Sequence, residues 1–223
     1  MSQPVIDRRT EAGEQTIRRV LDAAEERFAG EGFRGTSLRD IARDAGIRAP
    51  SLYNHFENKE ALYGAVLARA FGPMLEILER FLARGPEAYE TPGMATDMLA
   101  VLAARPNRAR LLLHEALSGN RHMNELLATW IERLFGSGLR AMRNSPGRHP
   151  WTKEELPLLL LAMNNVIAGY VAVAPAFEGT LVRDPLSPAA LRRQERFLAK
   201  LWTLLWEESP ERRDSPERGR GAN

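Results

Sequence analysis

Residues 36–59 concentrate side chains that can bind the base edges and the phosphate backbone of a nucleic acid. Guanidinium and amide groups pair with base edges, small apolar groups contact thymine methyls, and hydroxyls and amines are common phosphate donors. The candidate base contacts are Arg48, Ala49, Pro50, Ser51 and Asn54, and the candidate phosphate contacts are Thr36, Ser37, Tyr53, His55 and Lys59. Arg39 could serve either purpose.

Residues suited to catalysis or metal binding form no comparable pattern. The chain has no Cys, which removes disulfides, thiolate nucleophiles and Cys-ligated zinc. Gly-x-Ser-x-Gly, His-Glu-x-x-His and phosphate-cradling glycine-rich motifs are also missing from the sequence. His114, Glu115 and His122 are close in sequence, but zinc sites need three or four convergent ligands. We expect no enzymatic activity, no catalytic residue, no metal and no cofactor.

Apolar periodicity predicts three short helices that would position the nucleic-acid contacts. The first is predicted at residues 14–31, the second begins at Ser37 or Thr36, and the third covers residues 49–55. Ser37 and Asp40 have capping-box spacing, and Gly46 permits the turn between the last two helices. A helix-turn-helix places the start of its second helix on base edges and its first helix across the DNA backbone.

This arrangement resembles the DNA-binding head of the tetracycline-repressor (TetR) family over roughly residues 14–65. The resemblance rests on Phe28, Gly32-Phe33, Thr36, Ile41-Ala42, Ala45-Gly46-Ile47, Leu52-Tyr53-Asn54-His55-Phe56, Asn58-Lys59 and Leu62. It implies phosphate contacts at Tyr53 and Lys59. Arg48 departs from the Ser or Thr that the family often has there. It caps a helix poorly and could instead reach a phosphate or a guanine edge.

The remaining sequence predicts further helices and no strand of weight. They are expected at residues 58–83 with a kink or break at Gly72-Pro73, and at 93–104, 107–118, 122–143, 153–177 and 191–206. We therefore predict an all-α protein of about nine helices. Its parts would be a flexible arm at 1–13, a three-helix head at 14–57, a helical ligand-binding and dimerisation domain at 58–207, and a disordered tail at 208–223.

The overall charge is almost balanced. The formal net charge is +2, and the first 70 residues hold eleven basic against eleven acidic side chains. Attraction to DNA must therefore come from where the charges lie, because bulk charge is too small to steer it.

Residues 153–177 contain no charge between Glu155 and Glu178. The run is long enough for a membrane span, but Asn164, Asn165 and Gly169 lie in its middle. A helix that is apolar all round is otherwise buried on all sides. We interpret residues 153–207 as two helices that pair with a second copy of the chain.

The TetR resemblance also implies a small-molecule site between the C-terminal helices. Such sites are mostly apolar with a few placed polar groups. The candidate lining residues are Met98, Leu102, Leu112, Glu115, Trp130, Asn164, Asn165 and Tyr170. For Asn164 and Asn165, a partner across the dimer interface is an equal explanation.

The hypothesis from the sequence is a homodimeric, ligand-responsive transcriptional repressor of the bacterial cytoplasm. It would bind double-stranded DNA at a palindromic operator on the nucleoid and be released by an unidentified small molecule. The alternative is an all-α enzyme or interaction protein whose helix-turn-helix is only structural. Activation in place of repression stays open.

Overall fold

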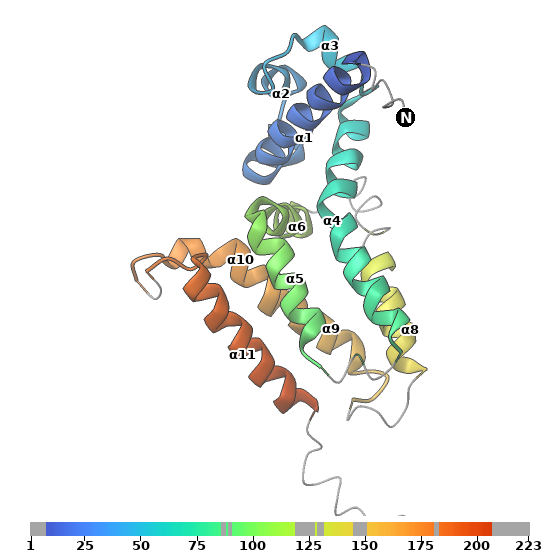
Figure 1. Cartoon of the computed structure of the whole chain (residues 1–223), viewed down its shortest axis with the longest axis vertical. Coiled ribbons are helices and arrows are strands. Elements are labelled where there is room, and N and C mark those ends of the chain that lie inside the picture. The colour runs from blue at the N-terminus through green and yellow to red at the C-terminus, as the bar shows by residue number, and fades with distance from the viewer. Residues whose placement is uncertain are drawn as a thin grey trace, which may run out of the picture. The chain divides into compact units, whose positions relative to one another are not determined.

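The computed structural model describes residues 8–85, 88, 91–118, 128, 132–144, 151–180 and 183–206. The elements formed by these residues are helices, which confirms the predicted all-α fold (Figure 1). The chain divides into two compact units, Met1–Met74 with Ala104–Ile131 and Leu75–Ala103 with Glu132–Asn223. The boundaries predicted from the sequence separate parts with different proposed functions, whereas these two units are defined by compactness. The predicted boundaries therefore stay predictions.

The first unit contains the predicted head together with one later helix. Its helices are α1 (Arg8–Gly35), α2 (Leu38–Asp44), α3 (Ala49–Tyr53), the first part of α4 (Lys59–Ala83) and α6 (Pro106–Ser118). α1 packs against α2 and α6 (Figure 1). Fully buried Phe28, Ile41, Leu52, Leu62 and Tyr63 form much of its core. Because α2 and α3 are short, this burial and not their own propensity holds them in place.

Helix α1 differs from its prediction at both ends. It begins at Arg8 and not at residue 14, so part of the predicted arm is helical, while residues 1–7 lie outside the described residues. The helix continues through Gly30 to Gly35, with a kink at Gly32, where φ is 70° and ψ is 173°. This conformation is almost restricted to glycine, so Gly32 redirects the chain toward α2.

Helix α4 is continuous through Pro73, so the predicted break there is wrong. Proline removes one helical hydrogen bond and crowds the preceding turn. Phe71 and Met74, on either side of Pro73, are both buried. Their burial outweighs the local cost and keeps the helix intact.

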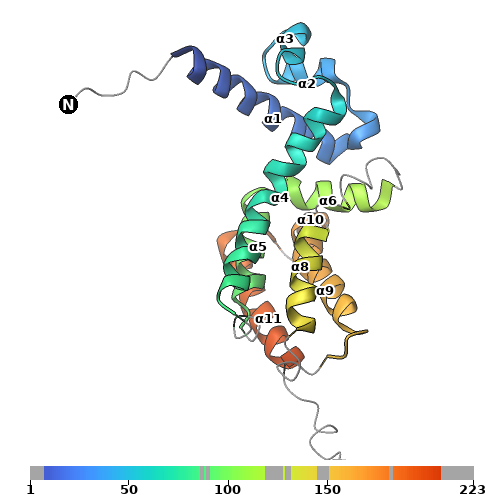
Figure 2. The same ribbon diagram turned by 90° about the vertical axis from the view of Figure 1, so that its right-hand side faces the viewer.

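The second unit consists of short consecutive helices. They are α5 (Gly93–Ala104), η2 (Glu132–Gly136), α8 (Ser137–Arg143), α9 (Leu156–Asn164), η3 (Asn165–Gly169), α10 (Tyr170–Val173), η4 (Ala174–Phe177) and α11 (Pro188–Trp206). α8 packs against α9 (Figure 2). The predicted division between residues 104 and 107 is confirmed, because α5 ends at Ala104 and α6 begins at Pro106. Most of the first half of the helix predicted at 122–143 lies outside the described residues.

Two helical stretches are long and apolar enough to span a membrane, judged by length and composition alone. They are Lys59–Ala83, with 56% of its most apolar window buried, and Leu156–Phe177, with 33% buried. The first is explained by burial in the protein. The second leaves the large apolar side chains of Leu158, Leu161, Val173 and Phe177 exposed.

Candidate nucleic-acid interface

The start of α2 is fixed by a side-chain cap. The Ser37 hydroxyl accepts a hydrogen bond from the Asp40 backbone N–H at 3.1 Å and donates to the Asp40 carboxylate at 2.6 Å. This confirms Ser37 as the N-cap and excludes the alternative cap at Thr36. Ser37 is exposed and could still reach the DNA backbone if α2 crossed it. Its phosphate contact remains a prediction.

Thr36 is buried, with 3% of its surface exposed. Its hydroxyl donates to the Gly32 carbonyl oxygen at 2.8 Å. A phosphate oxygen would need that same proton, because a hydroxyl has one to donate. Thr36 therefore stabilises the turn that follows the kink in α1. Its burial and this hydrogen bond argue against the predicted phosphate contact.

The turn between α2 and α3 closes on glycine. Gly46 has φ of 68°, and the next N–H, of Ile47, donates to the Ala42 carbonyl at 2.9 Å. Arg48 then occupies the N-cap of α3 without any side-chain hydrogen bond to the helix, as its chemistry predicts. Pro50 sits in the first turn, where its missing N–H is not needed.

Helix α3 is attached to the core by one face and leaves the other face free. Leu52 is fully buried and provides the attachment. Arg48, Pro50, Tyr53, Asn54 and His55 are exposed, while Ala49 and Ser51 are half-buried. The exposed fraction of Tyr53 is 57%, so its ring does not serve the core. These side chains stay free for a partner.

Lys59 has a packing role that the sequence did not reveal. Its ammonium lies 4.4 Å from the centre of the Phe33 ring. Phe33 in turn packs on Phe28 and Tyr63, with ring centres 5.9 and 5.2 Å away. Burial lowers the pKa of Lys59, and Glu60 opposes this. Lys59 thus joins the start of α4 to the end of α1, and its predicted phosphate contact stays a prediction.

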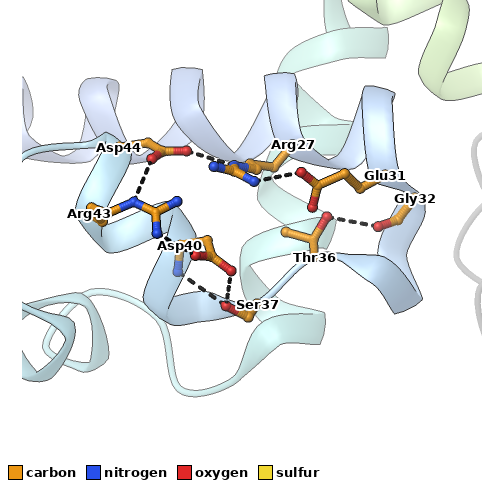
Figure 3. A network of polar contacts seen from close by, with 8 residues as sticks. All are labelled: Arg27, Glu31, Gly32, Thr36, Ser37, Asp40, Arg43 and Asp44. Atoms are coloured by element: carbon orange, nitrogen blue, oxygen red, sulfur yellow. Dashed lines mark hydrogen bonds and ion pairs between the residues drawn. The ribbon is translucent and has the colours of Figure 1, made fainter.

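A polar network joins α1 to α2 (Figure 3). Arg27 of α1 donates to Asp44 at 2.6 Å and to Glu31 at 2.5 Å. The hydrogen bond from Arg27 lowers the pKa of the Asp44 carboxyl, and in return the pKa of Arg27 is raised. The hydrogen bond from Ser37 likewise lowers the pKa of Asp40. Sequence reasoning missed Arg27 and Asp44, because 17 residues separate them and no periodic pattern connects them.

The exposed arginines of α2 and α3 differ in their surroundings. Arg43 is paired with Asp40 at 2.8 Å and with Asp44 at 3.2 Å. Arg39 and Arg48 are exposed, and neither forms an ion pair or side-chain hydrogen bond with another described residue. The positive charge available on this surface is therefore local, in agreement with the balanced composition.

Ion pairs also connect α1 with α4 and with the residue before α6, all within the first unit. Arg69 of α4 bonds Asp22 at 2.9 Å and Glu25 at 2.8 Å, and Arg105 bonds Asp22 at 3.0 Å. The Glu25 side chain is almost fully buried. Removing one partner of such a buried pair is costly, because the other charge is left uncompensated.

A separate cavity of about 50 Å³ lies in the second unit. It is lined by Met94, Ala95, Met98, Met142, Leu159, Leu160, Met163, Ile167, Trp202 and Trp206. The rings of Trp202 and Trp206 stack with centres 4.3 Å apart. The Nε1 of Trp206 is buried and has no hydrogen-bond partner among the described residues.

Of the predicted pocket residues, Met98 alone among the described side chains lines this cavity. Leu102 and Leu112 are buried elsewhere, Asn164 is half-buried and Asn165 is exposed. The Tyr170 hydroxyl donates to the Pro185 carbonyl at 2.7 Å, and burial raises the pKa of Tyr170. Trp130 and the side chain of Glu115 lie outside the described residues. Sequence reasoning predicted a mixture of apolar and polar lining residues, whereas this cavity is lined by methionine, tryptophan and aliphatic side chains.

Comparison with known proteins gives a consistent set of relatives. Residues 20–66 match the profile of the family described as "Bacterial regulatory proteins, tetR family". The chain is 34% identical over 88 residues to the HTH-type transcriptional repressor KstR2 of Rhodococcus jostii (strain RHA1), covering 40% of this chain and 42% of that protein. It is 33% identical over 119 residues to the HTH-type transcriptional regulator UidR of Escherichia coli (strain K12), covering 53% of each.

A solved structure extends the likeness beyond the head. SCO4942 from Streptomyces coelicolor matches with a TM-score of 0.60 and 25% identity, over 83% of this chain and 97% of that one. The sequence matches cover about half the length of the curated relatives or less. The head is thus supported by sequence and by fold, and the second unit mainly by fold.

Proposed function

The chain belongs to the TetR family of bacterial transcriptional regulators, and from this premise we propose that it is a repressor. In this proposal it binds a palindromic operator as a homodimer and a small molecule releases it. The observation that carries the DNA-binding part is the outer face of α3. That face and the residues that flank the helix bear arginine, tyrosine, asparagine and histidine side chains that the core does not use.

Each candidate residue has a role that its position supports. With α3 in the major groove, its first turn carries Arg48, Ala49, Pro50 and Ser51 to base edges, and Asn54 follows one turn later. Tyr53, His55, Ser37 and Lys59 flank this surface and contact phosphates, and Arg39 reaches the backbone from α2. Thr36 is left out, because its hydroxyl proton is used by Gly32.

Binding to labelled duplex DNA tests this proposal. The duplexes are the region upstream of the protein's own gene and a shuffled sequence of equal length, each titrated at several salt concentrations. We expect tighter binding to the upstream region, and affinity for both that falls as salt rises, because phosphate contacts release counterions. Affinity for neither duplex at any salt would favour an enzyme or interaction protein whose helix-turn-helix is structural.

The homodimer proposal rests on large apolar side chains that are exposed in the second unit. These side chains are Leu158, Leu161, Val173, Phe177, Phe197 and Leu204. They come from the run 156–177 and from α11, within the predicted residues 153–207. A second copy of the chain would cover them and would present two α3 helices to the two halves of a palindrome.

The effector proposal rests on the methionine- and tryptophan-lined cavity. It holds no charged side chain, so it favours an uncharged apolar ligand. The free Trp206 Nε1–H favours a ligand that carries a hydrogen-bond acceptor. Four methionines in the lining can adapt to a ligand larger than the present cavity, because the side chain is flexible. Met98 is the predicted pocket residue that this proposal retains.

A ligand of this kind would act by favouring one conformation of the repressor over another. Helix α4 belongs to both units, since the division falls after Met74, next to Pro73. It is therefore the element through which we propose that the effector alters DNA binding.

Tryptophan fluorescence tests the cavity directly. Small aromatic ketones, the corresponding hydrocarbons and the corresponding carboxylates serve as probes. The ketones should change the emission of Trp202 and Trp206, the hydrocarbons should bind more weakly, and the carboxylates should not bind. Preference for carboxylates would overturn the ligand class.

A reporter gene under the bound promoter distinguishes repression from activation. We place the protein in the bacterial cytoplasm, on the nucleoid when bound to DNA.

A further inference from the structure

Helix α2 carries two arginines on one face, and they are in different electrostatic states. Arg39 and Arg43 are four residues apart, so they lie one above the other along the helix. Arg39 has no ion-pair partner among the described residues. Arg43 has two, at 2.8 Å from Asp40 and 3.2 Å from Asp44. The side chain that could double the positive charge of this face is neutralised.

The two carboxylates that hold Arg43 are themselves held in place (Figure 3). The second oxygen of Asp40 accepts from the Ser37 hydroxyl at 2.6 Å, and the second oxygen of Asp44 accepts from Arg27 at 2.6 Å. A phosphate that drew Arg43 away would approach two fixed negative charges. The carboxylates therefore oppose a contact between Arg43 and a phosphate.

Structural support alone does not explain the whole arrangement. The pair between Arg27 and Asp44 joins α1 to α2 and has an obvious structural role. The pair between Arg43 and Asp40 lies within one helix turn, and 65% of the Arg43 side chain is exposed. Exposed pairs of this spacing contribute little to stability. Their main consequence is the charge that they remove from the surface.

We propose that Asp40 and Asp44 shield Arg43 from the DNA backbone, so that α2 offers a duplex one unpaired cation, Arg39, and not two. The inference rests on the proposed DNA-binding function. The shield keeps the sequence-independent attraction weak and leaves affinity more dependent on the side chains of α3. It also explains how a head with balanced charge can bind DNA without binding all DNA tightly.

Asp40→Asn tests the shield, because asparagine keeps the shape and the hydrogen bond with Ser37 but removes the charge. Binding to a shuffled duplex is measured between about 50 and 300 mM salt. One added phosphate contact in each subunit steepens the slope of log affinity against log salt by about 0.9 per subunit and raises affinity about tenfold per subunit near 0.1 M. Glu57→Gln, which removes an exposed carboxylate outside the network, is the matched control and should give a smaller change.

The same substitution in an Arg43→Gln background identifies the cation. If Arg43 makes the new contact, Asp40→Asn has no effect on the slope once Arg43 is gone. An equal effect in both backgrounds would mean a general loss of negative charge and would overturn the shield. Because Arg43 is exposed, its substitution leaves the fold intact, and melting curves check this for each variant.

The two proposals fail in different ways. If the wild type binds duplex DNA and its slope is unchanged both by Asp40→Asn and by Asp40→Asn combined with Asp44→Asn, only the shield is overturned. If the wild type shows no salt-dependent affinity for any duplex, the DNA-binding function is overturned and the shield with it.

Discussion

At the scale of single residues, Arg48 is the side chain at the start of α3 for which the proposed DNA contact can be tested most directly. It is exposed, caps nothing and pairs with no described residue, so it can reach a guanine edge or a phosphate. We expect Arg48→Gln to remove a base contact and to cost about 1–3 kcal/mol of preference for the operator, with a smaller loss on shuffled DNA. Competition binding with both duplexes measures this preference.

Arg39→Gln is the matched variant for that experiment. It should weaken binding to both duplexes by the same factor and reduce the salt slope by about 0.9 per subunit, as loss of a phosphate contact does. If Arg48→Gln gave the same uniform loss, Arg48 would be a phosphate contact and not a base contact.

Asp44 gives a prediction about pH. Its folded-state pKa is lowered, first by the hydrogen bond from Arg27. A carboxyl with a lowered pKa stabilises the fold above its unfolded value of 3.8, and this contribution is lost as pH falls through the lowered value. Asp44→Asn should therefore melt at a lower temperature than the wild type at pH 7, and the difference should shrink below about pH 3.8.

Thermal melts followed by circular dichroism at pH 7, 5, 4 and 3 measure this difference. Glu57→Gln removes a carboxylate without a partner among the described residues and should show no such pH dependence. A difference that stayed constant down to pH 3 would mean that Asp44 acts through its shape and not through its charge.

Residue chemistry was partly readable from the sequence. The Ser37 cap and the weak Arg48 cap follow from side-chain types at helix starts, and the structure contains both. The hydrogen bond from Thr36 to the Gly32 carbonyl and the contact of the Lys59 ammonium with the Phe33 ring could not be predicted from the sequence. Each depends on the direction that the chain takes after the kink, which no local pattern encodes.

At the scale of elements, the kink of α1 is the feature most sensitive to substitution. Gly32 has φ of 70°, and a Cβ there would collide with the imidazole ring of His114 from α6, in the same unit. Gly32→Ala should destabilise the protein by about 1–3 kcal/mol from backbone strain alone, with the collision added. Urea denaturation measures the change.

Gly30→Ala is the control for this substitution. Gly30 lies in the same helix with nothing within 4 Å of an added Cβ. Alanine there should leave stability unchanged or raise it by up to about 1 kcal/mol, because glycine is a weak helix former. Equal destabilisation by both variants would mean that the kink is not what requires glycine at residue 32.

Periodicity predicted most helices because it depends on which face is buried. It failed at helix ends and at Pro73, where packing outweighs local signals. The division between α5 and α6 was predictable, since Pro106 can begin a helix but cannot continue one. The continuation of α4 through Pro73 was not, because it depends on burial of Phe71 and Met74 on either side.

At the scale of the whole molecule, the uncharged run 156–177 led us to expect pairing with a second copy, and its burial now separates two explanations. A run buried within one chain would need no partner. Only 33% of the apolar window in Leu156–Phe177 is buried, and Leu158 and Leu161 are exposed. The position of the methionine- and tryptophan-lined cavity was not predictable, because its lining comes from α5, α8, α9, η3 and α11, which only the fold brings together.

Leu161→Glu tests pairing and DNA binding together. Leu161 is 58% exposed, so glutamate there costs the single chain little, but a charge buried at an interface without a partner is strongly unfavourable. The wild type should sediment at about twice the 25.0 kDa of one chain, and the variant as a monomer. Lys153→Glu, at an exposed polar position, should remain dimeric.

Because a palindrome requires two heads held together, the monomeric variant should also lose most of its operator affinity while keeping its weak affinity for shuffled DNA. A variant that became monomeric and bound the operator as tightly as the wild type would show that one head suffices, and a wild type that sedimented as a monomer would leave the exposed leucines for another partner.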